Sequence, residues 1–185
     1  MDIKEINYWL ARYNEEEDSY NTGLEEEVGC GIRQRKKVTK EELKRIIEWK
    51  FQGRLKGRKI RTFNLIENIK DSEIQKTTEV AFGCDSDELR LKLLMSIKGI
   101  KIALSSVILT FFDPQKYCIF DIHVYDELFH ASPKTRPKDL FVNTKYFTET
   151  LNRVRCLAKK SGLRARDVEK ALFKKNFEQN KIYHN

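Results

Sequence analysis

Apolar residues recur along most of the chain at intervals of three and four positions, the spacing of one helix face. The first such stripe consists of Ile3, Ile6, Trp9, Leu10 and Tyr13. Further stripes predict helices behind a Thr39–Glu42 capping box, over 62–69, 72–82 and 88–96, over 102–109, from Asp121 to His130, and on both sides of Gly162. The polar stretches 14–37 and 133–137 are predicted to be loops. No strand pattern is present, so we predict an all-α fold.

Composition narrows the class of protein. With 185 residues, 40% of them hydrophobic, the chain is long enough for one domain with a packed core. Its four cysteines are far apart in sequence, which argues against a zinc or iron–sulfur site and predicts buried thiols. The N-terminus lacks the apolar core of a signal peptide, and the most apolar run, 102–112, is too short to span a bilayer. We therefore expect a soluble, cytoplasmic monomer without membrane contact.

Charge is distributed unevenly. Residues 1–30 contain 9 acidic and 2 basic side chains, whereas residues 31–61 contain 13 basic and 3 acidic ones. A basic block beside an acidic one indicates a face that binds a polyanion, and nucleic acid is the candidate. A solvated surface run is the alternative. Within the block, we expect Arg54, Lys56 and Arg58 to contact phosphates, and Trp49 and Phe51 to pack in the core.

Candidate chemistry lies in residues 93–129, LLMSIKGIKIALSSVILTFFDPQKYCIFDIHVYDELF. A helix ends near Ser96, a tight turn around Gly99 follows, and an entirely apolar helix comes next. Two helices joined by such a turn expose main-chain N–H groups at the start of the second helix, where the helix dipole is positive. We expect the turn residues Lys98, Gly99, Ile100 and Lys101 to contact the DNA backbone.

This segment resembles the helix-hairpin-helix superfamily of base-excision DNA glycosylases. Gly99 matches the first hairpin glycine of that family, and Phe120-Asp121-Ile122-His123-Val124 matches its aspartate motif, which puts Asp121 on the catalytic aspartate. The resemblance covers about a fifth of the chain. It implies a single helical domain over residues 1–185 with two lobes and a cleft between them, and the hairpin and catalytic motif within 85–130. It also implies double-stranded DNA as the partner and no cofactor or metal.

Two positions depart from the family pattern. Lys101 stands where the family has its second hairpin glycine, and Ala103 stands where bifunctional members have a nucleophilic lysine. Because a methyl group cannot form a Schiff base, the resemblance implies a monofunctional DNA N-glycosylase with water as the nucleophile. Repair of a damaged base and removal of a modified base from phage DNA, as a defence, both fit it.

Asp121 has two possible roles. In the enzyme that the resemblance implies, the target base is flipped out of the duplex, and the Asp121 carboxylate stabilises the sugar cation and activates water. Asp is also a favoured N-cap residue, so Asp121 can simply begin the next helix. The chain would then be a non-catalytic helix-hairpin-helix module that binds DNA. His123 is expected either to contact a phosphate or to support the helix.

Overall fold

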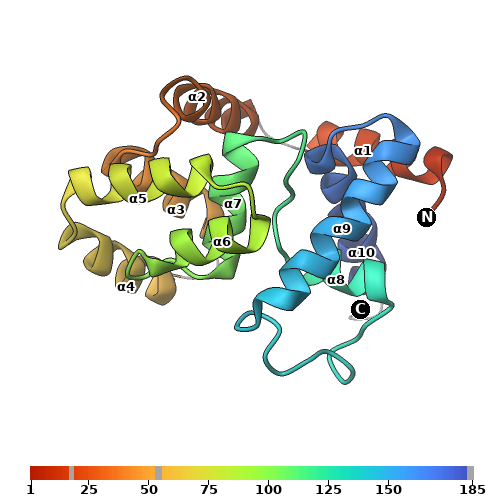
Figure 1. Ribbon diagram of the computed structural model, residues 1–185. Coiled ribbons are helices and arrows are strands. Elements are labelled where there is room, and N and C mark those ends of the chain that lie inside the picture. The colour runs from red at the N-terminus through yellow and green to blue at the C-terminus, as the bar shows by residue number, and fades with distance from the viewer. Residues whose placement is uncertain (17–18, 53–55, 183–185) are drawn as a thin grey trace.

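The computed structural model describes residues 1–16, 19–52 and 56–182, without the side chains of 19–22, 56 and 180–182. These residues form ten α-helices and no strand, which confirms the predicted all-α class (Figure 1). The helices are α1 (Ile3–Glu16), α2 (Ser19–Arg35), α3 (Lys40–Lys50), α4 (Lys56–Glu67), α5 (Asp71–Gly83), α6 (Asp87–Ser96), α7 (Ile102–Phe112), α8 (Ile122–Phe129), α9 (Thr144–Ser161) and α10 (Ala165–Ile182).

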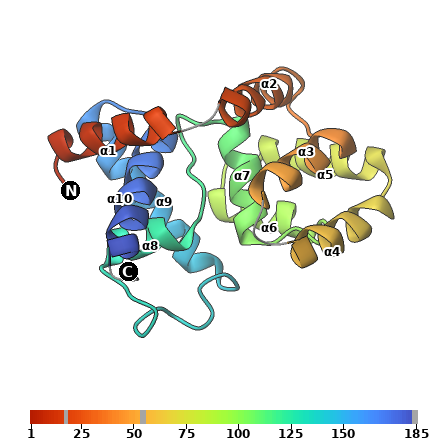
Figure 2. The same cartoon turned by 180° about the vertical axis from the view of Figure 1, so that it is seen from behind.

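The helices form two groups (Figures 1 and 2). The central group is α2–α7, in which α7 packs against α2, α3 and α6. The terminal group is α1 with α8, α9 and α10, and α10 packs against the other three. The segment that follows α7 runs from the central to the terminal group and leads into α8. Residues from both ends of the chain therefore build one group, and the middle of the chain builds the other.

Most predicted helices are present with small shifts at their ends. The capping box is confirmed: Thr39 accepts the Glu42 N–H, and the Glu42 carboxylate accepts the Thr39 N–H at 2.9 Å. Gly162 ends α9 in the left-handed conformation, with φ of 71°. Helix α4 begins at Lys56, six positions before the predicted start.

The predicted loop over 14–37 is wrong, because residues 19–35 form α2. Leu24, Val28 and Ile32 are spaced four apart and are buried, so the helix has an apolar stripe that the surrounding acidic residues obscured. Gly29 lies against α7, since a Cβ there would be 2.9 Å from the carbonyl oxygen of Phe111. The glycines that seemed to indicate a loop therefore include one that allows close helix packing.

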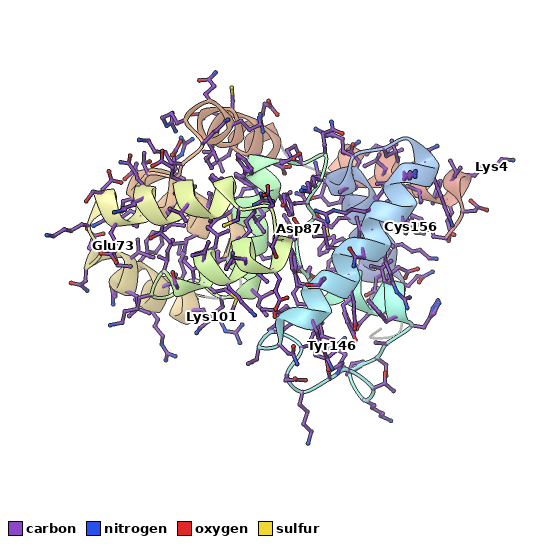
Figure 3. The ribbon with its side chains drawn as sticks, in the orientation of Figure 1. Lys4, Glu73, Asp87, Lys101, Tyr146 and Cys156 are labelled. Carbon is purple, nitrogen blue, oxygen red and sulfur yellow. The ribbon has the colours of Figure 1, made fainter. Side chains whose placement is uncertain are left out.

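Asp87, at the start of α6, connects the two groups (Figure 3). Its carboxylate accepts hydrogen bonds from Arg155 of α9 and from the Tyr117 hydroxyl, both at 2.5 Å. Burial alone raises the pKa of Asp87, but these two hydrogen bonds outweigh it and hold the pKa below its usual value. Burial and the bond to Asp87 also raise the pKa of Tyr117 to about 12. The network fixes α6, the segment after α7 and α9 together.

The described helices also bear on membrane crossing and on the burial of the cysteines. No helix in the described part of the chain is long and apolar enough to cross a membrane. The expectation of buried cysteines holds for Cys118, but Cys30 and Cys156 are exposed and Cys84 is half-buried. Sequence spacing did not reveal this because Cys30 and Cys156 lie on the outer faces of their helices.

Candidate nucleic-acid interface and active site

The turn between α6 and α7 has the form of a hairpin. The Ile100 N–H donates to the Ile97 carbonyl at 2.9 Å, and Gly99 has φ of 94°, which favours glycine. Lys101 is the N-cap residue of α7 and its side chain accepts no hydrogen bond from the first N–H groups of that helix. Lys98 and Lys101 are exposed, whereas the Ile100 side chain is fully buried. Contact between Ile100 and DNA therefore has to come from its main chain.

Asp121 begins α8 as its N-cap. Its Oδ1 accepts the His123 N–H at 3.1 Å, which is the capping role expected from sequence. The four residues before it, Tyr117 to Phe120, are almost fully buried. The Phe120 N–H donates to the Ser106 hydroxyl of α7 at 2.9 Å, and the Ile119 N–H donates to Glu169 of α10 at 3.3 Å. These bonds hold Asp121 between the central and terminal groups.

The second carboxylate oxygen of Asp121 faces a lysine from another helix. Lys50, the last residue of α3, donates from its Nζ to Asp121 Oδ2 at 3.1 Å. The two side chains are 18% and 23% exposed, so both are accessible from solvent but mostly enclosed. Burial raises the pKa of Asp121, but the Lys50 charge and the bonds from His123 and Lys50 outweigh it and hold the pKa below its usual value. Asp121 is therefore an anion at neutral pH.

Lys50 and Asp121 line three neighbouring cavities between the groups, of 420, 460 and 140 Å³. The 420 Å³ cavity also contains the hairpin residues Gly99 and Lys101, with Ala103 of α7. The structure thus brings the predicted hairpin and the predicted catalytic aspartate into one cavity. Figure 3 shows Lys101 at the edge of the central group, on the same side of the molecule as Tyr146.

Positive charge surrounds this cavity. Arg58 and Arg61 of α4 line it together with Lys101, and all three side chains are exposed. Of the other basic residues expected to bind DNA, Arg54 lies outside the described residues, and so does the side chain of Lys56. Sequence reasoning did not single out Arg61 or Lys50. The exposed cations match the negative charge of a DNA backbone.

The His123 side chain packs against residues of α10. Its Nδ1 lies 2.9 Å from the Asn176 side-chain oxygen. The rings of Phe173 and Phe177 pack edge-to-face with the imidazole ring, at centroid-to-centroid distances of 5.3 and 5.5 Å. The residue also lines the 460 Å³ cavity beside Asp121. These contacts fit the expectation that His123 supports α8, and the cavity position keeps a phosphate contact open.

The 140 Å³ cavity has aromatic and buried charged walls. Trp49 lies between Phe111, whose ring centroid is 5.3 Å away, and the guanidinium of Arg166 at 5.7 Å. The expected core packing of Trp49 and Phe51 is thus present in part, since both also line cavities. In the described structure the buried Trp49 Nε1–H has no acceptor. Arg166 forms ion pairs with Glu169 and with Glu25 of α2, so two carboxylates stabilise a buried cation in this wall.

A signal for Lys50 was present in the sequence. Leu43, Ile46 and Ile47 of α3 are fully buried, and Lys50 follows the last two by four and three positions. Residues with these spacings lie on the same helix face, so Lys50 is a cation on the side that faces the interior. An ammonium in that position requires a partner, and Asp121 is that partner. The pairing itself joins residues 71 positions apart and cannot be read from local pattern.

Comparison with models of known protein families, with curated proteins and with solved structures finds no match to this chain.

Proposed function

We propose that this protein is a DNA N-glycosylase with a two-lobed helix-hairpin-helix fold, which hydrolyses the bond between a damaged or modified base and its sugar. The observation that carries the proposal is the shared cavity, in which an uncapped helix start and a positive-φ glycine lie together with the Asp121 carboxylate. Three exposed cations around it provide electrostatic attraction for the phosphates.

The chemistry follows from the charge at Asp121. Breaking a glycosidic bond builds positive charge on the sugar, and a carboxylate near that sugar stabilises the cation. The lowered pKa keeps Asp121 anionic, so it can also accept a proton from an attacking water. Trp49, Tyr13 and Phe173 line the cavity beside Asp121 and would provide an apolar wall for a flipped base.

The test is a panel of DNA duplexes that each carry one modified base. Removal of the base leaves an abasic site, which alkali converts to a strand break. Asp121→Asn retains a cap oxygen for the His123 N–H but loses the charge, so excision should slow by roughly 10²–10⁴-fold while DNA binding persists. Loss of the pair with Lys50 should cost about 1–2 kcal/mol of unfolding free energy.

A second candidate function is a DNA-binding module without catalysis. It is favoured by the hydrogen bonds of Asp121, both of whose oxygens already bind protein groups. In that case the wild-type protein binds duplex DNA but releases no base from any member of the panel. A strongly destabilised Asp121→Asn variant with unchanged DNA affinity would also assign Asp121 to structure.

A further inference from the structure

The 140 Å³ cavity beside Asp121 contains a second carboxylate, that of Glu169 on α10. The Glu169 side chain is only 4% exposed, and its carboxylate forms an ion pair with Arg166, one turn earlier on the same helix. Its Oε2 also accepts the Ile119 N–H at 3.3 Å. Because Ile119 lies two residues before Asp121, Glu169 holds the main chain that carries the proposed catalytic carboxylate.

We propose that Glu169 is a positioning residue for Asp121, which fixes the segment before α8 so that the Asp121 carboxylate stays against Lys50. In this role Glu169 acts through the Ile119 main chain rather than on the reacting atoms. A catalytic group that is misplaced by about 1 Å can cost about 10²-fold in rate, so such a support bears directly on catalysis. The inference rests on the proposed function for the reaction that Asp121 serves, but the position of Asp121 can be measured without that reaction.

Buried charges tie Glu169 to the central group. The Arg166 guanidinium, which is fully buried, also donates from its Nη2 to Oε2 of Glu25 on α2 at 2.9 Å. Glu25, Arg166 and Glu169 therefore form a chain of charges that runs from α2 to α10. The next N–H before α8, that of Phe120, donates to the Ser106 hydroxyl of α7. Two consecutive main-chain groups are thus anchored to the two groups of helices, which restricts the start of α8.

Titratable and charged groups from every element around this cavity face Glu169 or line the cavity with it. They are Tyr13 of α1, Glu25 of α2, Lys50 of α3, Arg166 of α10, and Cys118 and Asp121 of the segment that leads into α8. Burial raises the pKa of Glu169 and outweighs the opposing charges of Arg166 and Lys50, whereas the pKa of Asp121 lies below its usual value. The two carboxylates of the cavity therefore titrate at different pH, and each can be followed separately.

The test is an NMR titration of the free protein with isotope-labelled carboxyl groups, so it requires no substrate. Glu169→Asp keeps the negative charge but shortens the side chain by one methylene, which withdraws the carboxylate from the Ile119 N–H. Asp121 should then move away from Lys50, and its pKa should rise. Glu169→Gln is the matched variant, because it keeps the reach and an acceptor oxygen but loses the charge. The pKa of Asp121 should not rise in that variant, since removal of a nearby negative charge favours the anion.

Two results would overturn the inference. The first is an Asp121 pKa that is unchanged or lowered in Glu169→Asp, since a carboxylate that is merely nearby would act in that way. The second is a rise in Glu169→Gln as large as in Glu169→Asp, because the reach of the side chain would then be irrelevant.

A measurement on the wild type does not depend on whether either variant folds. A neutral carboxyl group accepts a weaker hydrogen bond than a carboxylate does, so protonation of Glu169 should weaken its bond to Ile119. The Ile119 amide proton should therefore shift at the pH at which Glu169 titrates. An amide proton that does not respond there refutes the contact and the inference with it.

Excision assays separate this inference from the proposed function. On the modified duplex that the wild type processes fastest, Glu169→Asp should lower kcat by up to about 10²-fold with little change in KM, because Asp121 is displaced while the hairpin is untouched. Glu169→Gln should retain most of the activity. If the wild type releases no base, the proposed glycosylase is refuted, and the NMR titration still decides the role of Glu169. If the wild type releases a base and both variants match its kcat, only the Glu169 inference fails.

Discussion

Replacement of Gly99 by alanine tests the hairpin geometry directly. At φ of 94°, a residue with a side chain is strained by about 1–2 kcal/mol. The new Cβ would also lie 3.2 Å from Cβ and 3.3 Å from Cδ1 of Leu65 on α4, which is closer than ordinary packing. Because Leu65 is only half-buried and can shift, this crowding should add about 1 kcal/mol, the lower end for overpacked sites. The expected total is about 2–3 kcal/mol.

Thermal unfolding measures this cost. For a chain of this size, a loss of 1 kcal/mol lowers the Tm by about 2–4 °C, so Gly99→Ala should lower it by about 4–12 °C. Gly162→Ala is the matched control, because Gly162 has φ of 71° but open space around a new Cβ. This variant should be destabilised by backbone strain alone, and its Tm should fall by about 2–8 °C.

DNA affinity, measured well below both melting temperatures, separates packing from recognition. Gly99→Ala should weaken binding, because crowding against Leu65 and strain at positive φ would shift the main-chain N–H groups of the turn that are proposed to contact a phosphate, whereas Gly162→Ala should bind as the wild type does. A Gly99→Ala protein that melts no lower than the Gly162→Ala control would refute the proposed contact with Leu65. Unchanged DNA affinity would show that Gly99 serves only to turn the chain.

Three other measurements test the site and its support. Ser106→Ala leaves a buried main-chain N–H without its acceptor and should cost about 1–3 kcal/mol in denaturant unfolding, whereas Ser105→Ala removes a buried hydroxyl that has no partner in the described structure and should be neutral or stabilising. Asp87→Asn should cost about 1–3 kcal/mol at neutral pH. Because the folded pKa of Asp87 is lowered, its contribution is complete above the unfolded value of about 3.9, declines below that value and is lost as the pH falls through the folded pKa, so the stabilities of the two proteins should begin to converge near pH 4 and become equal only at lower pH. DNA binding should show a log–log salt slope of roughly −2.7 for three phosphate contacts, and Lys101→Gln should reduce its magnitude by about 0.9, while Lys92→Gln, remote from the lining of the cavity, should leave it unchanged.

The sequence predicted those parts of the fold that depend on local pattern. Apolar periodicity and a capping residue identify a helix wherever the stripe is clean, as in α3, and an unbroken apolar run identifies α7. The pattern failed in α2, because its stripe of Leu24, Val28 and Ile32 is narrow and is interrupted by glycine and acidic residues that favour loops. A narrow stripe is sufficient in the folded protein because α7 supplies the complementary surface.

In the candidate site, too, local sequence pattern predicts some features and tertiary packing determines the others. Motif order predicted that the hairpin and Asp121 belong together, and they line one cavity. The pairing of Lys50 with Asp121, and the approach of Arg61 to the hairpin, depend on how α3 and α4 pack against distant segments. Such contacts between remote residues are set by tertiary structure, so a sequence pattern can mark a candidate, such as a lysine on an inner face, without naming its partner.

The pairing of α1 with α10 has a consequence for biosynthesis. Residues of α1 leave the ribosome before the central group, but the side chains that bind them, such as Lys175 against Glu5, are made after it. The central group is continuous in sequence and can begin to fold while the nascent chain is still growing. Until α10 emerges, the apolar face of α1 lacks most of the surface that covers it in the folded protein. The space around Asp121 is therefore completed last, and a nascent chain stalled before α10 would hold the hairpin without a finished active site.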